Sequence, residues 1–260
     1  MKELLVVIPA RTGSKGLPGK NFRILGGKKL VDRSMFHAQH FSGIADIVVS
    51  TDDELYIAEN ISEIESKSSL NPKEGDCIPH DKGILHIRPK KYAQDNSLIM
   101  DLIHHLCFES NLQKGKKRKR YKAVLLLQPT SPFRSAAELS EMLSFLTNSV
   151  NSSTSLVSLK DTRDIHPARM YSEIGDGLFE GIKSYHEYRH SRRQDCPNLF
   201  IRDGGYYVIG LDLVKKKLQT NPQVVGIIRK NPYSINIDSE SDFVLANHYL
   251  NEATDDPNCF

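Results

Sequence analysis

Short apolar runs rich in β-branched residues alternate with longer helical patterns along most of this 260-residue chain. The apolar runs predict strands, and they lie at 3–9, 46–50, 84–87, 122–128, 154–159, 206–210 and 224–229. The longer patterns predict helices at 30–41, 53–66, 96–111, 135–147 and 239–252. Strand–helix alternation favours an α/β layer fold with a mostly parallel sheet, and near-continuous apolar strands indicate helices on both faces of it.

Two stretches interrupt this alternation. Residues 67–83 are polar and contain two prolines, which predicts a surface insertion. Residues 160–203 are too long for an idle connection, so we expect a lid, an arm or a subunit contact there.

Composition excludes several classes of protein. There is no apolar run near 18 residues, and the beginning MKELLVVIPAR resembles a strand rather than a signal peptide, so we expect no membrane span and a cytoplasmic location. The net charge of +3 argues against a nucleic-acid binder. The basic run KGKKRKRYK at 114–122 is an exception that suits a nuclear-localisation signal in a eukaryote or, more simply, a solvated linker.

The most distinctive stretch is IPARTGSKGLPGKN at 8–21, a glycine-rich loop with three cationic side chains directly after a predicted strand. A Walker A loop does not fit, because five residues rather than four separate Gly13 from Gly19 and Asn21 replaces the hydroxyl residue. A Rossmann fingerprint does not fit either, because the glycines fall at 13, 16 and 19. The spacing therefore leaves open which phosphate chemistry the loop serves.

Polar segments follow several predicted strands in turn. They are the loop just described, STDDE at 50–54, Arg88 with the later DNS at 95–97, QPTSPFR at 128–134 and SINIDSESD at 234–242. Ligands of a parallel sheet bind beyond the carboxyl ends of its strands, so these segments should meet there. Cations on one rim and carboxylates on another predict a site for a polyphosphate with magnesium.

Taken together, these motifs resemble the acylneuraminate cytidylyltransferases, the CMP-sialic acid synthetases. The resemblance rests on IPARTGSKGLPGKN, GGKKL, VVSTDDELYIAE, LLLQPTSPFR and NIDSESDF, in that order, and extends from residue 3 to about 250. It implies a Rossmann-like α/β nucleotidyltransferase domain at 1–159 and 204–260, with a protruding dimerisation and sugar-binding arm at 160–203. It also implies that CMP is transferred from CTP to the anomeric 2-hydroxyl of a nine-carbon α-keto acid sugar, with release of pyrophosphate, by a homodimer that uses Mg²⁺.

The same resemblance assigns roles to individual residues. It implies catalytic roles for Arg11, Lys20 and Asp238, and a magnesium site at Asp238 and Asn236. The nucleotide would be bound by Ala10, Arg11, Ser14, Lys15, Lys20, Asn21, Arg88, Ser97 and Gln128. The acidic sugar would be bound by Gln128, Arg169, Arg193 and Tyr207.

Two departures from the family pattern affect substrate and metal. The last motif has Asn236-x-Asp238 where the family usually has two aspartates, which lowers the charge available to a cation. RDGG at 202–205 replaces an R-x-N-G type sequence, which is compatible with a different nine-carbon sugar such as legionaminic or pseudaminic acid, or with a different keto sugar altogether.

Two alternatives remain at this stage. HEYRH at 186–190 spells the zinc-protease pattern H-E-x-x-H, with His186 and His190 as ligands, but no downstream glutamate follows before residue 240. The second alternative is a catalytically weakened nucleotide-sugar-binding protein of the same fold, because Asn236 replaces a metal-site carboxylate.

Overall fold

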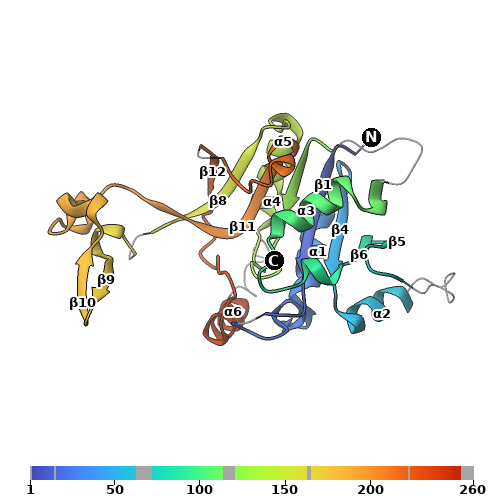
Figure 1. Ribbon diagram of the computed structural model, residues 1–260, viewed down its shortest axis with the longest axis horizontal. Helices are drawn as coiled ribbons and strands as arrows, with labels where there is room; N and C mark the ends of the chain where they lie inside the picture. The colour runs from blue at the N-terminus through green and yellow to red at the C-terminus, as the bar shows by residue number, and fades with distance from the viewer. Residues whose placement is uncertain are drawn as a thin grey trace.

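A computed structural model describes residues 2–14, 16–62, 72–113, 121–162, 165–221 and 223–252 of the chain. Its centre is an eight-stranded sheet in the order β12-β8-β11-β7-β1-β4-β6-β5 (Figure 1). The strands are β1 (Leu4–Ala10), β4 (Ala45–Thr51), β5 (Cys77–His80), β6 (Gly83–Ile87), β7 (Ala123–Leu126), β8 (Ser155–Asp161), β11 (Phe200–Gly210) and β12 (Val225–Ile228).

Four of the seven neighbouring strand pairs in this sheet are parallel, namely β7–β1, β1–β4, β4–β6 and β12–β8. The three antiparallel pairs are β11 with β7, β11 with β8, and β5 with β6. The prediction of a mostly parallel sheet is therefore confirmed, and the parallel strands form its centre.

Helices cover both faces of the sheet, as predicted. Alternate residues of β1 point to opposite sides, so that Val6 and Ile8 join one apolar cluster while Leu5 and Val7 join another. The first cluster includes residues of α1 (Leu30–Ala38), α2 (Glu54–Ser62) and α4 (Ala136–Asn148). The second includes residues of α3 (Ile99–Phe108) and α5 (Leu211–Lys215).

A third, smaller apolar cluster joins the last helix to the first loop. It contains Phe243 and Ala246 of α6 (Glu240–Glu252) and Leu17, which follows β1. The short hairpin β2 (Ile24–Leu25) and β3 (Lys28–Lys29) lies between this loop and α1. Packing α6 against the first loop brings the last helix to the edge of the sheet where β1 ends.

Local capping explains where the helices begin. Ser135 and Glu138 form a reciprocal capping box at α4, and Asp53 Oδ1 accepts a hydrogen bond from the Tyr56 amide at α2. Ser239 and Asp242 exchange side-chain to backbone hydrogen bonds at the start of α6. Each cap stands at a position where the sequence predicts a helix start.

The prediction of a surface insertion at 67–83 is wrong for the part that the structure describes. Residues 77–80 form β5, which pairs antiparallel with β6 at the edge of the sheet. Pro79 is tolerated there because an edge strand has one side free of ladder hydrogen bonds. Residues 67–71, and most of the basic run (114–120), lie outside the described residues.

The segment between β8 and β11, called the arm below, projects away from the sheet (Figure 1). It carries the hairpin of β9 (Tyr171–Gly175) and β10 (Leu178–Gly181) together with short 3-10 turns. β8 and β11 remain paired as far as Asp161 and Phe200, so the arm lies between these two residues, and the predicted bounds of 160 and 203 fall within the two strands. No helix in the described ranges is long and apolar enough to cross a membrane.

Candidate active site

A cavity of about 410 Å³ opens at the carboxyl ends of the central parallel strands, a size typical of small-molecule sites. Nine of the residues predicted for the site line it: Arg11, Ser14, Lys20, Asn21, Arg88, Ser97, Gln128, Asn236 and Asp238. Arg11 follows β1, Arg88 follows β6 and Gln128 comes two residues after β7. These three strands run parallel, which is why side chains from distant parts of the sequence meet at one edge.

The glycine-rich loop after β1 is fixed by hydrogen bonds to its neighbours. Asp52, just beyond β4, accepts hydrogen bonds from the Thr12 amide and the Thr12 hydroxyl, each 2.9 Å long. The buried Asn21 donates from Nδ2 to the Arg11 carbonyl oxygen, which closes the loop upon itself. The loop is thus fixed by Asp52 at the edge of the sheet and by Asn21 at its own end.

At two of the three glycine positions in this loop, the structure explains why glycine is needed. Gly19 has a φ of +62°, in the left-handed region that favours glycine. A Cβ atom at Gly16 would lie 2.5 Å from the carbonyl oxygen of Asp238, so only glycine lets the loop approach that residue. Gly13 has open space at its Cβ position.

Lys20 and Asp238 form the contact between the cationic and the acidic rim of the cavity. The Lys20 ammonium lies 2.6 Å from Asp238 Oδ1. Asn236 Nδ2 donates to the other oxygen, Oδ2, over 2.5 Å. Asp238 is therefore bonded through both carboxylate oxygens, although its side chain is 62% exposed.

Arg11 and Arg88 supply two further positive charges. Arg11 Nη1 lies 3.2 Å from Asp95 Oδ1 and also donates to the Gln94 carbonyl oxygen. Burial lowers the pKa of Arg88 to about 10, and the nearby Asp52 carboxylate opposes that shift. Arg88 therefore remains charged near neutral pH, and with the Arg11 guanidinium beside it the cavity attracts anions.

Comparison with known proteins agrees with this geometry. Residues 5–65 match the family described as Cytidylyltransferase. This segment, which contains the glycine-rich loop after β1, resembles the cytidylyltransferase family. The predicted resemblance is thereby confirmed, and relatives that carry more specific names support it.

The CMP-N,N'-diacetyllegionaminic acid synthase of Legionella pneumophila is 34% identical over 131 residues, covering 50% of this chain and 47% of that protein. The N-acylneuraminate cytidylyltransferase of Escherichia coli is 28% identical over 252 residues, covering 94% of this chain and 51% of that protein. The chain thus spans about half the length of these curated relatives. A solved structure of CMP:2-keto-3-deoxy-manno-octonic acid synthetase complexed with CTP has a TM-score of 0.58 at 14% identity, covering 96% of this chain and 99% of that one. This structural likeness confirms the α/β nucleotidyltransferase fold.

Sequence reasoning missed the apolar wall of the cavity. Tyr92, Leu98, Ile99 and Leu102 line it alongside the cationic groups. All four lie between Arg88 and the middle of α3, on either side of the predicted DNS segment. Leu98 is 66% exposed at the start of a helix, which is a signal that the sequence pattern alone does not give.

Arg134 of the QPTSPFR motif has a role that the sequence also did not reveal. It is fully buried and donates from Nη2 to the carbonyl oxygens of Gln128 and Gly205. A guanidinium in this position joins the turn after β7 to β11. The motif therefore places Gln128 at the cavity, and Arg134 of the same motif stabilises the turn that carries Gln128.

Asn236 and Asp238, the residues predicted to bind a cation, both line the cavity and carry side-chain oxygen atoms. Asn236 Oδ1 is buried and has no hydrogen-bond partner among the described residues. It would lie 3.3 Å from a Cβ atom at Gly204, a residue with a φ of +79°. An unpaired amide oxygen beside the Asp238 carboxylate suits a hard cation, which takes oxygen ligands. The pair therefore fits magnesium as a two-residue site completed by ligands from outside the protein.

Several predicted residues do not line this cavity. Ala10 is fully buried in the first apolar cluster, and Tyr207 is buried in the second. Burial raises the pKa of the Tyr207 phenol. Lys15 lies outside the described residues. Their assignments to nucleotide and sugar stay predictions.

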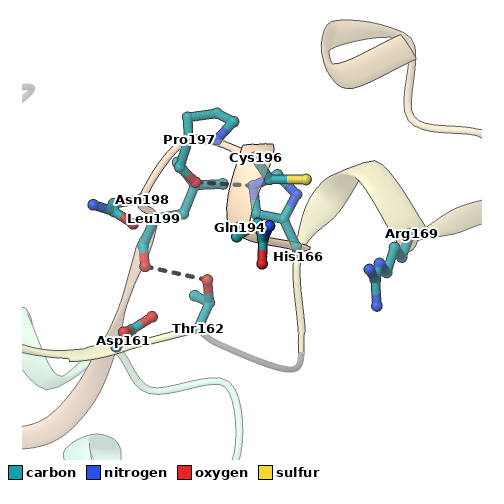
Figure 2. Close-up of a pocket in the computed structure, with 9 residues that line it drawn as sticks. All are labelled: Asp161, Thr162, His166, Arg169, Gln194, Cys196, Pro197, Asn198 and Leu199. Carbon is teal, nitrogen blue, oxygen red and sulfur yellow. Dashed lines mark hydrogen bonds between the residues drawn. The ribbon is translucent and has the colours of Figure 1, made fainter. Parts of the chain in front are cut away.

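Arg169 lies on the arm instead, at a second cavity of about 320 Å³ (Figure 2). There His166 accepts a hydrogen bond at Nδ1 from the Ala168 amide, so that Nε2 donates to the Pro197 carbonyl oxygen. Arg193 belongs to a 3-10 turn of the same arm, and its side chain lies outside the described part of the structure. The predicted sugar-binding arginines are therefore carried by an element separate from the main cavity.

The zinc alternative fails on geometry. The H-E-x-x-H pattern needs one continuous α-helix to place its two histidines on one face. Residues 183–188 instead form 3-10 turns with a kink at Tyr185, and His190 lies beyond their end. Among the described residues, no group of three His, Cys, Asp or Glu side chains is arranged to bind a metal.

Proposed function

We propose that this protein is a cytidylyltransferase that transfers CMP from CTP to the anomeric 2-hydroxyl of an acidic nine-carbon α-keto sugar. The observation that carries the proposal is the cavity in which Arg11, Lys20 and Arg88 face Asp238 at the ends of the central strands. Three cations around one carboxylate suit a substrate with close to four negative charges and a bound divalent ion. The names of the relatives from Legionella pneumophila and Escherichia coli support the choice of nucleotide and sugar class.

In the proposed reaction, the anomeric oxygen attacks the α-phosphorus of CTP. A new O–P bond forms, the bond between the α-phosphorus and the bridging oxygen breaks, the hydroxyl proton is released to solvent, and pyrophosphate leaves. Lys20 and Arg11 would neutralise the charge that develops on the phosphoryl oxygens, since both are held by existing contacts and need little rearrangement. The Gly16 close approach keeps Lys20 beside Asp238 while this happens.

Asp238 and Asn236 would hold Mg²⁺ in this proposal. The ion would supply charge compensation for the triphosphate and for the leaving group. A single carboxylate with one amide is a weak site by itself, so the substrate phosphates would have to provide further ligands. Metal binding is then expected to depend on bound nucleotide.

We further propose that the arm joins two copies of the chain. Its hairpin exposes Tyr171, Ile174, Leu178 and Phe179, each more than half exposed. Apolar side chains gathered on a projecting hairpin are typical of an interaction surface. Within a homodimer, Arg169 would be able to reach the sugar in the partner's cavity, where an arginine fork suits a carboxylate.

The test is a screen of pyrophosphate release by the purified protein. CTP, UTP and GTP are each offered with N-acetylneuraminic, legionaminic and pseudaminic acids and with an eight-carbon keto sugar, in the presence of Mg²⁺. Release with CTP and one of the nine-carbon acids supports the proposal, and release with none of the combinations contradicts it. Binding of CTP without release would favour the catalytically weakened protein, and an Asn236→Asp variant that restores release would identify the weakened step.

A further inference from the structure

Within the described residues, the Arg88 guanidinium forms its hydrogen bonds with Ser50. Its Nε donates to Ser50 Oγ over 3.2 Å, and its Nη2 donates to the Ser50 carbonyl oxygen over 2.9 Å. Ser50 belongs to β4, and Arg88 directly follows β6, the next strand of the sheet. Both residues are buried, at 0% and 4% exposure. One edge of the guanidinium is therefore fixed in the sheet, while Nη1 forms no hydrogen bond within the described part of the chain.

The Ser50 hydroxyl has a second neighbour, His86, whose Nδ1 lies 2.9 Å from Oγ. The two residues are register partners in the parallel pair β4–β6, and His86 is fully buried. Arg88 Nε can only donate, so the Ser50 oxygen accepts from it. The one hydroxyl proton of Ser50 then has His86 Nδ1 as its acceptor.

This arrangement fixes the form of the imidazole. Nδ1 must be unprotonated to accept, so the ring proton of neutral His86 resides on Nε2. Burial lowers the pKa of His86 to about 3, with smaller contributions from His105 and Arg88, which keeps the ring neutral. The ring packs against His105 of α3 at 5.4 Å between centroids, and His105 packs against the cavity residue Tyr92 at 5.0 Å.

A packing role alone does not account for His86. Its Nε2 is buried without a hydrogen-bond partner among the described residues, and an unpaired polar atom destabilises a core. An apolar side chain of similar size would fill the space between β6 and α3 at lower cost. Histidine is therefore favourable at position 86 only because its acceptor nitrogen, Nδ1, faces the Ser50 hydroxyl.

We propose that Ser50 and His86 are positioning residues for Arg88. His86 accepts the Ser50 proton and so turns the oxygen lone pairs of Ser50 toward Arg88 Nε. The guanidinium is then locked with its Nη1 hydrogens directed to an oxygen or ring acceptor of the bound nucleotide. This inference rests on the proposed function in one respect, namely that the ligand is a nucleotide.

The positioning of Arg88 by Ser50 and His86 can be tested without any ligand by ¹⁵N spectroscopy of the side chains. We expect a slowly exchanging Arg88 Nε–H signal, assigned by its loss in Arg88→Lys, and ¹⁵N shifts of His86 that report a neutral ring protonated on Nε2. In Ser50→Ala and in His86→Leu the Arg88 signal should shift and exchange at least about tenfold faster, because a buried bond to a charged group is lost or weakened. His86→Asn, whose Oδ1 takes the place of Nδ1, should restore the slow exchange.

The consequence for the ligand is tested by calorimetric titration with CTP and Mg²⁺. Ser50→Ala is expected to weaken binding about tenfold or more and His86→Leu about threefold or more, whereas His86→Asn stays within about twofold of the unmodified protein. In an Arg88→Met background, the Ser50 and His86 substitutions should have no further effect, because they act through Arg88. Ser110→Ala is the matched control, since Ser110 is also buried and its hydroxyl donates to the Leu106 carbonyl oxygen of α3 rather than taking part in the support of Arg88.

The two experiments separate the possible failures. If the unmodified protein binds no nucleotide but its Arg88 signal responds as expected, the proposed function is wrong and the positioning role stands. If CTP binds and neither Ser50→Ala nor His86→Leu changes the Arg88 signal or the affinity, the positioning role is overturned. His86 protonated on Nδ1 would overturn it as well. Ser50→Ala removes only one oxygen atom, so it keeps the test decisive even if His86→Leu does not fold.

Discussion

The Lys20 ammonium contacts the Asp238 carboxylate at 2.6 Å, although 218 residues separate them in the chain. Lys20 ends the glycine-rich loop after β1, and Asp238 lies just before α6. The third apolar cluster brings the two segments together, since Leu17 packs with Phe243 of that helix. The contact therefore joins the cationic rim of the cavity to its acidic rim.

Replacing Lys20 with methionine should reduce kcat/KM for pyrophosphate release by about a hundredfold or more, because a preorganised cation at developing charge contributes that much. The melting temperature should change little, since Asp238 is largely exposed and exposed ion pairs stabilise weakly. Lys29→Met is the matched control, because Lys29 pairs with Glu59 on the surface away from the cavity. Near-normal turnover of the Lys20 variant would remove Lys20 from the reaction.

Gly16→Ala should impair activity, whereas Gly13→Ala should not. A Cβ atom at position 16 would meet the Asp238 carbonyl oxygen at 2.5 Å, so the loop must move away from the acidic rim. Position 13 has open space and no positive φ. We expect at least about a tenfold loss of kcat/KM at position 16, since displaced groups lose their orientation. Equal activities of the two variants, measured side by side, would show that the close approach is not needed.

Asn236→Asp should strengthen the response to magnesium. The new carboxylate would lie beside Asp238 in place of an amide that now donates to it, so the two charges repel without a cation and attract one when it is present. The magnesium concentration for half-maximal rate should fall roughly fivefold, and the melting temperature should drop in EDTA and recover with Mg²⁺. Asp238→Ala serves as the comparison and should abolish the magnesium response. An unchanged titration in both variants would remove these residues from the metal site.

Arg229→Met should destabilise the fold by about 3–5 kcal/mol. Arg229 pairs with Asp203 at 3.1 Å and with Glu138 at 2.9 Å, and the Arg229 and Asp203 side chains are each 1% exposed. Its loss leaves carboxylates buried without a counter-charge. Chemical denaturation measures the change, and the double variant Arg229→Met with Asp203→Asn should recover part of it.

The same pair gives the protein an acid-sensitive stability. Burial alone would raise the pKa of Asp203, but Arg229 and hydrogen bonds from Ser158, Gly205 and Ser234 outweigh it and lower that pKa. A carboxyl with a depressed folded-state pKa stabilises the fold above its unfolded value of about 3.9, and this contribution is lost as the pH falls toward the lower folded value. Denaturation of the native protein and of Asp203→Asn should therefore differ at pH 7 and converge below pH about 4. Asp81→Asn, at an exposed turn, should not reproduce that convergence.

Replacing Phe179 with serine should weaken self-association. Phe179 is 61% exposed on the arm hairpin, and its removal subtracts apolar area from the proposed dimer contact. Light scattering coupled to gel filtration should report a dimer for the native protein and a larger monomer fraction for the variant. Leu55→Ser removes an apolar side chain of 77% exposure from α2 and should leave the mass unchanged. A monomeric native protein would contradict the dimer.

Elements with a strong local signal were predicted well from the sequence. The apolar run LLVV predicted a strand at 3–9 and the structure has β1 at Leu4–Ala10, because a strand buried on both faces reads as continuous apolar residues. β5 was missed, since CIPH is short, contains Pro79 and is stabilised only by pairing with β6. The arm hairpin was missed for the same reason, because its pairing is local to a segment without an apolar core face.

The sequence by itself determined which residue types meet at the cavity, because motif spacing places Arg11, Arg88 and Gln128 at the carboxyl ends of predicted strands. Only the tertiary structure decided how they are paired. The contact of Lys20 with Asp238 and the support of Arg88 by Ser50 and His86 depend on which strands and helices become neighbours. That neighbourhood is set by long-range packing and sheet register, which local patterns along a chain do not encode.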